Sequence, residues 1–510
     1  MAVRVFIFQK SNLNMDVMLL ARRLDTIIRE NLDRLPTEPF VWWQKTWWSR
    51  CAFSELTDEC EERLRVSGFK KGQRLALLMP NSPVLLATAA AVWRLGGAVV
   101  FIDFRSGYVP IVRQLQHADV FAALTYRGCE DMVQLISEEG IPCSVISLDT
   151  LDENIPGRPC AQESEDIAVI FYTSGTTGEP KAVPLTHENL LSCIEGCVEH
   201  IDTLDEDDVF LNALPNSNVF GFVCGALLPM VKASRQAILP SFMPVEVSMD
   251  AIRSAEVTIV TAVPTMIAMM SGAVARGAIP SRSIRCIISG GDRLPSAVSR
   301  RAARYFNVPI VQGYGLTEAS SVVALPPSLK SVKEGSVGTI ISCLEAEIRG
   351  DDGSVLPVGR EGHLWVRGKS VAQSYYRNPE LTAERFSDGW FYTCDIAKFD
   401  EDGYLYLVAR DCDVIFVGGF KVYAREVELV LEEHPAVLDA AVVGVPRSIS
   451  GEIVKAYIVL KKGERVSSKE LLAYCKKKLS YYKVPRIIEF VTEMPRSAIG
   501  EIVKRKLSKD

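Results

Sequence analysis

Nine residues in the middle of the chain have the composition of an anion-binding loop. Residues 173–181 read Thr-Ser-Gly-Thr-Thr-Gly-Glu-Pro-Lys and directly follow the apolar run Ile167–Tyr172. Glycines let backbone N–H groups approach an anion closely, hydroxyl groups can donate to its oxygens, and a lysine supplies the opposite charge. The segment lacks the glycine spacing and the Gly-Lys-Ser/Thr ending of a Walker A loop. These residue types predict a loop that binds a polyphosphate, with an ordinary turn rich in Thr, Ser and Gly as the alternative.

The composition is that of a globular protein with more than one packed unit. The chain has 510 residues, of which 48% are hydrophobic, and single cores rarely grow beyond about 300 residues. A net charge of -6 gives no global attraction to nucleic acid or to anionic membranes. The longest apolar run, Val84–Trp93, is far shorter than the roughly 20 residues of a transmembrane helix. The 13 cysteines form no CxxC pair, which fits reduced thiols, so we expect a cytoplasmic protein.

Short apolar runs alternate with helix-length segments over most of the chain, which predicts parallel α/β layers. The expected helices include residues 82–94 and 130–139. The expected strands lie at residues 74–79, 98–102, 120–124, 144–147, 167–172, 209–214, 258–263, 283–289 and 309–312.

The pattern changes towards the C-terminus. Beyond about residue 335 the segments alternate and are punctuated by turns, which predicts a β-rich subdomain that closes the large domain. The last hundred residues read as a further, small α+β unit, with strands at 439–445 and 456–460 and a helix at 468–479. Residues 1–14 precede the first helical pattern and read as an N-terminal arm.

Five further segments follow the loop in a fixed order, and together with it they resemble the acyl-adenylate-forming (AMP-binding) superfamily. They are residues 313–318 (Gly-Tyr-Gly-Leu-Thr-Glu), 392–395 (Tyr-Thr-Cys-Asp), 410–413 (Arg-Asp-Cys-Asp), 418–423 (Gly-Gly-Phe-Lys-Val-Tyr) and the tail 495–505. The likeness covers nearly the whole chain from about Met15 and is strongest to fatty acyl-CoA and acyl-carrier-protein synthetases.

The resemblance implies a two-domain enzyme with a two-step reaction. We expect an adenylation domain at 15–409, a hinge at 410–413 and a small mobile domain at 414–510. A carboxylate would first attack the α-phosphate of ATP to give acyl-AMP and pyrophosphate, and the thiol of CoA or of an acyl-carrier protein would then displace AMP.

The resemblance also implies residue roles. The loop residues Thr173, Ser174, Gly175, Thr176, Thr177, Gly178 and Lys181 would hold the β- and γ-phosphates, with Thr173 and Glu318 on Mg²⁺. Ser289, Gly290, Gly291, Gly313 and Tyr314 would line the adenine, and Thr317 would reach the α-phosphate. Asp395 and Arg410 would bind the ribose, and Gly419 would line the route of the pantetheine thiol.

The acyl pocket is expected to be apolar. The matching positions are Asn218, Phe220, Gly221, Val263 and Pro264. Amino-acid-adenylating domains place an aspartate in this region to pair with the ammonium group, and none stands here. Each buried CH₂ of a bound chain contributes about 0.8 kcal/mol. A fatty or other apolar carboxylic acid is therefore favoured over an amino acid, and peripheral membrane contact stays open.

Four positions depart from the family pattern. Asn218 replaces a histidine, Cys394 a glycine, and Cys412 the usual hinge residue. Glu501 replaces the lysine that stabilises the adenylation transition state. One unit-charge pair at about 4 Å and an effective dielectric near 20 amounts to roughly 4 kcal/mol, so a carboxylate there could slow adenylation severely. Either Lys504 or Lys506 takes over, or adenylation is slow, or the protein is a catalytically impaired nucleotide- and acyl-binding homologue.

Overall fold

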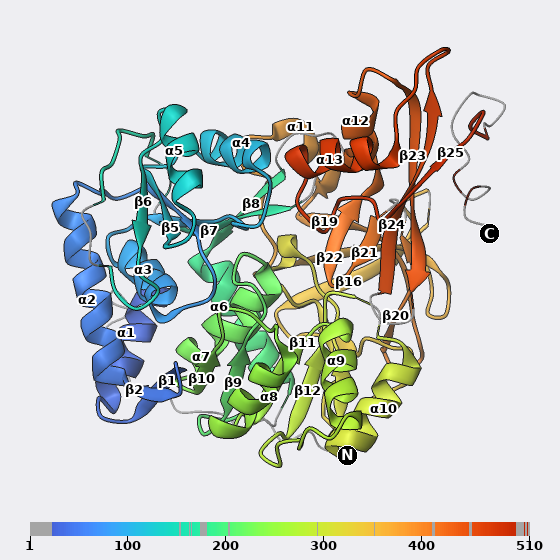
Figure 1. The fold of residues 1–510 in the computed structure, drawn as a ribbon. Helices are drawn as coiled ribbons and strands as arrows, with labels where there is room; N and C mark the ends of the chain where they lie inside the picture. The colour runs from blue at the N-terminus through green and yellow to red at the C-terminus, as the bar shows by residue number, and fades with distance from the viewer. Residues whose placement is uncertain are drawn as a thin grey trace.

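The computed structural model describes residues 23–151, 155–162, 164, 166–173, 181–201, 204–292, 294–350, 352–410, 414–447, 451–495, 504 and 507. The chain forms two α/β layers, a β-rich layer and a C-terminal unit (Figure 1). We call residues 23–410 the N-terminal body and residues 414–495, with 504 and 507, the C-terminal unit. The expected fold class is confirmed.

The first layer is a six-stranded sheet in the order β6-β5-β3-β4-β7-β8. All its neighbours pair in parallel except β7 and β8, which pair antiparallel across the predicted anion loop. The strands are β3 (Arg74–Leu78), β4 (Ala98–Phe101), β5 (Ala122–Tyr126), β6 (Cys143–Ile146), β7 (Ile167–Thr173) and β8 (Lys181–Thr186). The connecting helices are α3 (Pro83–Arg94), α4 (Tyr108–Ala118) and α5 (Glu130–Glu138).

The second layer is a seven-stranded sheet in the order β13-β12-β11-β9-β10-β1-β2. Its strands are β1 (Pro39–Trp43), β2 (Thr46–Ser49), β9 (Val209–Asn212), β10 (Arg235–Ile238), β11 (Ile259–Ala262), β12 (Cys286–Ser289) and β13 (Ile310–Gln312). The helices around it are α1 (Leu24–Arg34), α2 (Arg50–Val66), α6 (His187–His200), α7 (Leu228–Val231), α8 (Val245–Ser254), α9 (Pro264–Ala275) and α10 (Ser296–Phe306). Because β11, β12 and β13 are parallel, the motif residues that follow them meet at one edge.

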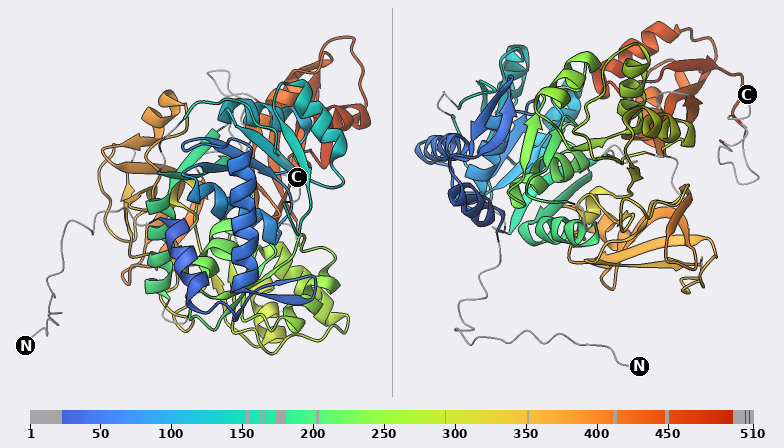
Figure 2. Two further views of the ribbon diagram at one scale, coloured as in Figure 1. Left: turned by 90° about the vertical axis from the view of Figure 1, so that its left-hand side faces the viewer. Right: turned by 90° about the horizontal axis from the view of Figure 1, so that it is seen from below.

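The β-rich layer confirms the change of pattern near residue 335. It contains β14 (Ala324–Leu325), β15 (Thr339–Ile340), β16 (Leu344–Arg349), β17 (Gly362–Gly368), β18 (Phe386–Ser387), β19 (Trp390–Phe399) and β20 (Leu405–Arg410), with the short helix α11 (Pro379–Arg385). Its strands pair antiparallel. Figure 2 shows this part, coloured yellow to orange, as a layer beside the green α/β layer.

The C-terminal unit has its own sheet and its own core. Its elements are β21 (Val414–Val417), β22 (Phe420–Tyr423), α12 (Ala424–Glu432), β23 (Val437–Arg447), β24 (Gly451–Leu460), α13 (Ser468–Lys478) and β25 (Ile487–Phe490). Val422, Val427, Leu431 and Ile458 belong to a buried cluster formed within this unit. Helix α13 packs beside α4 of the N-terminal body (Figure 1).

Local sequence explains where the central helices begin. Ser82 accepts a hydrogen bond from the Leu85 N–H at 3.2 Å and Pro83 occupies the first turn of α3, the arrangement that favours a helix start. Thr186 and Asn189 form a reciprocal capping box at the start of α6. These ends place α3 and α6 against the two sheets.

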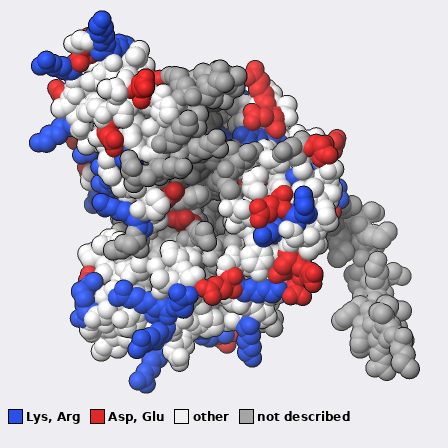
Figure 3. Space-filling view, turned by 90° about the vertical axis from the view of Figure 1, so that its right-hand side faces the viewer, with Lys and Arg blue, Asp and Glu red and all other residues white. Residues whose placement is uncertain are grey.

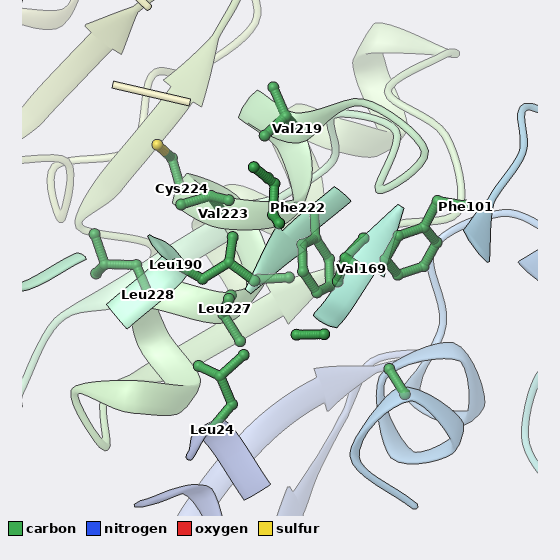
Figure 4. Close-up of a cluster of buried hydrophobic side chains, with 14 of the residues drawn as sticks. Leu24, Phe101, Val169, Leu190, Val219, Phe222, Val223, Cys224, Leu227 and Leu228 are labelled. Atoms are coloured by element: carbon green, nitrogen blue, oxygen red, sulfur yellow. The ribbon is translucent and has the colours of Figure 1, made fainter. Parts of the chain in front are cut away.

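A buried cluster joins the two α/β layers around residues 221–231. Residues Gly221–Leu227 form a π-helix that leads into α7. Figure 4 shows Phe222 between Val223 and Cys224 on one side and Val169 of β7 and Phe101 of β4 on the other. The rings of Phe101 and Phe222 have centroids 4.7 Å apart. This packing fixes the segment that carries the predicted acyl-pocket residues.

No helix in the described ranges is long and apolar enough to cross a membrane. Figure 3 shows both basic and acidic side chains on the face that carries the C-terminal unit, without one sign covering it.

Candidate active site

One cavity lies where the two layers and the C-terminal unit meet, and it has a volume of about 140 Å³. Motif residues from four segments of the N-terminal body border it. They are Thr173, Asn218, Phe220, Gly290, Gly291, Gly313, Tyr314 and Thr317. The structure therefore brings the predicted nucleotide and acyl residues to one place.

A lysine, a glutamate and a tyrosine form a buried group at the start of β8. Lys181 Nζ lies 3.0 Å from Glu318 Oε1, and the Tyr375 hydroxyl donates to the same oxygen at 2.7 Å. Lys181 Nζ also lies 4.6 Å from the centroid of the Tyr375 ring. A charge-assisted hydrogen bond in a buried site holds its partners more firmly than one in water. Lys181 and Glu318 are thus fixed next to the end of the anion loop.

The predicted ribose residues lie on the β-rich layer. Asp395 is buried in β19 and accepts a hydrogen bond from the Tyr314 hydroxyl. Arg410 is the register partner of Asp395 on β20. Cys394 has φ +63°, a left-handed conformation that favours glycine. The cysteine therefore keeps the backbone turn in which the family has glycine.

Buried amides support the segment that carries Asn218. The Asn216 backbone N–H donates to Asn81 Oδ1 at 2.9 Å. In turn, Asn81 Nδ2 donates to the Leu214 carbonyl at 2.7 Å. Asn212 Oδ1 accepts from both Asn81 and Asn216 at 3.0 Å. Buried polar groups that hydrogen-bond to one another in this way restrict the movement of the segment that carries them. The segment around residues 214–216 is accordingly held by Asn81, which lies just before α3, and by Asn212 at the end of β9.

The other predicted acyl residues have different placements. A Cβ at Gly221 would overlap the Pro215 carbonyl, so this glycine allows the tight entry into the π-helix. Pro264 starts α9 and is buried, and neither Gly221 nor Pro264 borders the cavity. Val263 precedes Pro264 and faces Gly419 of the C-terminal unit.

The C-terminal unit closes one side of the cavity with two segments, residues 418–423 and 480–483, which we call the cover. Gly419, Phe420 and Tyr482 border the cavity. The Phe420 and Tyr482 rings stack with centroids 4.2 Å apart. Gly419 has φ +85°, and a Cβ there would overlap Val263 Cγ1. Only glycine fits this close approach without a shift of its neighbour.

A second cavity, of about 450 Å³, lies between α4 and the C-terminal unit. Basic and acidic side chains border it, among them Arg113, Lys478, Lys483 and Glu426. Both cavities share the bordering residues Tyr172, Thr173, Ser217, Asn218, Phe420 and Tyr482. Asn218 thus stands at the partition between them, with its Oδ1 accepting the Phe220 N–H at 2.8 Å.

The cavity of about 140 Å³ has a neutral, mostly apolar surface. Among the described residues that border it there is no Lys, Arg, His, Asp or Glu. Burial raises the pKa of the Cys224 thiol to about 12, so this side chain is uncharged near neutral pH. Ser289 Oγ is buried and has no hydrogen-bond partner among the described residues. A ligand could supply that missing partner.

Several predicted positions lie outside the described residues: Ser174, Gly175, Thr176, Thr177, Gly178, Cys412, Glu501 and Lys506. Lys504 is described, and its Nζ lies 2.8 Å from Glu428 Oε1 within the C-terminal unit. Glu428 also accepts the Val442 N–H at 2.9 Å. Lys504 therefore contacts α12 of the C-terminal unit.

Comparison with known protein families decides the family. The model of the AMP-binding enzyme family matches residues 28–376, and the model of the AMP-binding enzyme C-terminal domain matches residues 426–501. The chain belongs to the AMP-binding enzyme family. The first match contains the anion loop and residues 313–318, and the second reaches the tail at residue 501, while segments 392–395, 410–413 and 418–423 lie between the two matches.

Curated relatives of this AMP-binding enzyme are CoA ligases. A feruloyl-CoA synthase of Amycolatopsis sp is 34% identical over 450 residues, which cover 86% of this chain and 89% of the relative. A long-chain-fatty-acid–CoA ligase of Bacillus subtilis is 30% identical over 485 residues, which cover 87% and 86%. This AMP-binding enzyme is accordingly an acid–thiol ligase.

Solved structures of similar proteins differ in how well they superimpose. A double mutant of o-succinylbenzoate CoA synthetase from Bacillus subtilis, bound with its product analogue OSB-NCoA, has a TM-score of 0.84 at 26% identity and covers 95% of this chain and 98% of its own. The same enzyme in complex with AMP has a TM-score of 0.68 at 28% identity, with the same coverage. The amide bond synthetase McbA from Marinactinospora thermotolerans has a TM-score of 0.85 at 28% identity and covers 94% and 99%.

Sequence reasoning missed two parts of this AMP-binding enzyme's site. Tyr375 reaches Glu318 from 57 residues away, and Asn81 reaches Asn216 from 135 residues away. Asn81 precedes the helix-start signal Ser82-Pro83, which marks the turn but not its distant partner. A contact across such separations depends on packing that no local pattern contains.

Proposed function

We propose that this enzyme activates a compact carboxylic acid with an uncharged, apolar tail through an acyl-AMP, and transfers the acyl group to the thiol of CoA. The absence of charged side chains among the described residues that border the cavity of about 140 Å³ carries this proposal. A second carboxylate or an ammonium group on the substrate would be buried there without a counter-charge, which costs several kcal/mol.

The size of the cavity narrows the acid further. A cavity of about 150 Å³ lined by apolar side chains holds one benzene molecule, and this cavity measures about 140 Å³. Part of that space borders the nucleotide motif at Gly313 and Thr317. A single aromatic ring or a short aliphatic chain fits the remaining space, whereas a long fatty chain exceeds it. The acid is therefore apolar, as expected from the sequence, and its acyl group is small.

The residues around the cavity fit the nucleotide. Ser289 Oγ has no hydrogen-bond partner among the described residues and faces this space, and Tyr314 and Asp395 present a phenol and a carboxylate for hydroxyl groups. Glu318 and Thr173 offer oxygen ligands of the kind that Mg²⁺ prefers. The Lys181 ammonium group would stabilise the negative charge of the phosphates, which favours the attack of the acid on the α-phosphate.

The second cavity supports CoA as the acceptor. It reaches Phe420 and Asn218 at the partition, and Arg113 on its border suits a phosphate of CoA. Lys478 and Lys483, also on its border, are paired with Glu433 and Glu426. The higher TM-score to the complex with a CoA product analogue than to the AMP complex of that same enzyme supports the view that the cover stands in the position for thiol transfer. We further propose residues 410–413 as the hinge. A carrier protein is the alternative acceptor.

The acid is tested by pyrophosphate exchange with benzoate, cinnamate, hexanoate, palmitate, 2-succinylbenzoate and phenylalanine. We expect kcat/KM to be at least about tenfold higher for the compact uncharged acids, since two buried methylene groups already amount to about 1.6 kcal/mol. Leu228→Ala enlarges the cavity and should shift the preference towards longer acids, while Leu64→Ala removes a core leucine elsewhere and should not. Highest activity with palmitate, or with phenylalanine, would overturn the proposal.

The impaired homologue is the second candidate, because Glu501 carries the wrong charge for the adenylation step. The variant Glu501→Lys distinguishes an active ligase from an impaired homologue. If the natural enzyme shows little exchange with intact ATP binding and the variant gains at least about tenfold, the natural protein is impaired in adenylation. If both are equally active, Glu501 lies outside the reaction path.

A further inference from the structure

One arginine of the N-terminal body is surrounded by aromatic rings of the cover. Arg105 lies between β4 and α4, and its guanidinium carbon is 5.7 Å from the centroid of Phe420 and 5.3 Å from that of Tyr481. The ring of Phe104, the preceding residue in the N-terminal body, has its centroid 5.6 Å from the same carbon. All three rings are within the roughly 6 Å at which a cation is attracted to an aromatic face. Arg105 therefore links the N-terminal body to the cover.

Asp103 fixes the direction of the Arg105 side chain. The Arg105 Nε and Nη2 atoms donate to the two Asp103 oxygens at 2.8 and 2.9 Å. The Arg105 backbone N–H donates to Asp103 Oδ1 at 3.0 Å. A two-pronged pair of this kind sets orientation as well as distance. The guanidinium is consequently positioned before the cover meets it.

The rings that contact Arg105 are connected to the partition between the two cavities. Phe420 stacks on Tyr482, and both border both cavities. Gly419, next in the chain, lies against Val263. Beside this cluster the Ser480 hydroxyl donates to the Ser106 hydroxyl at 2.9 Å. A shift of Phe420 would hence change the opening between the cavities.

We propose that Arg105 is a positioning residue for thiol transfer: it holds Phe420 and Tyr481, and through them the cover, over the acyl-AMP. This role rests on the proposed function, because it concerns its second half-reaction. The groups proposed for adenylation are Lys181 and Glu318 of the N-terminal body and the tail position 501, whereas Arg105 contacts Phe420 and Tyr481 of the cover. Adenylation should therefore depend little on Arg105.

The experiment measures the two half-reactions separately. Thioester formation is followed from supplied cinnamoyl-AMP with CoA, and adenylation by pyrophosphate exchange with cinnamate. Arg105→Gln should lower the rate of thioester formation about tenfold, as expected for the loss of cation–ring contacts, and leave exchange within about twofold. Tyr481→Leu should shift the same ratio in the same direction, and its side chain is exposed enough (44%) to leave folding intact.

Two controls separate positioning from other roles. Arg367 makes the same two kinds of contact within the β-rich layer, with Glu345 Oε2 at 2.7 Å and the Trp390 ring at 4.5 Å; Arg367→Gln should leave both rates unchanged. Pantetheine replaces CoA in the second control. If Arg105 acted on CoA phosphates, the defect of Arg105→Gln would disappear with pantetheine, whereas a positioning role predicts that it persists.

Each outcome decides the question. Equal thioester rates for Arg105→Gln and the natural enzyme, an equal loss in both half-reactions, or rescue by pantetheine would each overturn the role of Arg105 while leaving the proposed function standing. A natural enzyme that makes no thioester from cinnamoyl-AMP and from hexanoyl-AMP would overturn thiol transfer itself, and with it this role. A persistent, selective loss supports the proposal.

Discussion

The two sides of the site are held in different ways. On the N-terminal body, Lys181, Glu318 and Tyr375 are joined by short buried contacts, and Asn81 and Asn216 lie at most 2% exposed beneath the acyl segment. We call this side the cradle. The cover, by contrast, belongs to another unit, and its stacked rings Phe420 and Tyr482 border the cavity. It contacts the N-terminal body through the Tyr481 ring, which lies against Arg105, and through the Ser480 hydroxyl, which bonds to Ser106.

Because of this difference, the cradle depends on the folding stability of the N-terminal body, whereas the cover depends on how the two units are placed against each other. Removing one partner of a buried polar group costs about 1 to 3 kcal/mol, so the geometry of the cradle is tied to the folding of the N-terminal body. A contact of the cover can be lost while both units stay folded, because each has its own core. The cradle should therefore govern adenylation and the cover thiol transfer, and substitutions should separate the two half-reactions.

The largest expected effect breaks the cradle. Lys181→Met removes the cation proposed to hold the phosphates and should lower pyrophosphate exchange by about 100- to 1000-fold, the usual loss when one stabilising group of a developing charge is removed. Thioester formation from supplied acyl-AMP should stay within a few-fold of the natural rate. Lys333 is a matched control, since its Nζ contacts Asp400 at 2.6 Å and the Tyr404 ring at 4.2 Å away from the site. Equal losses in both half-reactions would contradict the division between cradle and cover.

The reverse effect is expected from the cover. Gly419→Ala places a Cβ onto Val263 Cγ1 and should lower thioester formation about 100-fold, while exchange stays unchanged. Single-turnover assays of both steps measure it. Gly463→Ala is the control, because its φ of +87° brings the same backbone strain in open space. Val263→Ala should restore part of the lost rate in the double variant; no restoration would show that the overlap is not the cause.

A smaller effect tests how the cradle holds its carboxylate. Tyr375→Phe removes the hydroxyl that donates to Glu318 Oε1 at 2.7 Å and should slow exchange about tenfold, the equivalent of one hydrogen bond to a charged group. If Glu318 binds Mg²⁺, the Mg²⁺ concentration for half-maximal exchange should change as well. Tyr404→Phe loses a comparable bond, to the Ser331 carbonyl at 2.8 Å, and should leave exchange unaltered.

The sequence predicts the cradle better than the cover. The apolar runs at 98–102 and 167–172 became β4 and β7, and the motif residues Gly290, Tyr314 and Thr317 border one cavity because parallel strands end at one edge. Local periodicity and turn chemistry contain this information. The β-rich texture after residue 335 was equally visible, since alternation and turns are local signals.

The contacts of Arg105 and Tyr375 could not be predicted in that way. Arg105 meets Phe420 only because α4 lies against the C-terminal unit, and Tyr375 meets Glu318 only because the β-rich layer folds back on the sheet. The size of the acyl cavity likewise depends on how Leu228 and Leu325 pack in its wall. Such features follow from tertiary packing of distant segments, which composition and spacing do not specify.

The smallest expected effect changes the stability of the cradle without touching the chemistry. His187 lies at the start of α6, accepts the Leu24 N–H at 3.3 Å, and is buried against Trp93. Burial lowers the pKa of His187 to about 3, whereas an unfolded histidine has a pKa of about 6.5. Between these values the unfolded chain binds more protons, so stability falls as the pH is lowered, by about 1.4 kcal/mol at pH 5.5.

His187→Phe removes that dependence and keeps a ring beside Trp93. The variant should lose about 1 kcal/mol at pH 7.5, from the Leu24 N–H left without its acceptor, but its melting temperature should fall about 2 °C less than that of the natural enzyme between pH 7.5 and 5.5. His434→Phe, in the C-terminal unit, should leave the pH dependence in place. Because His187 lies in the core and not at the cavity, the ratio of the two half-reaction rates should stay constant in the variant. A changed ratio would mean that the cradle transmits strain to the cover, and that the two sides of the site are coupled.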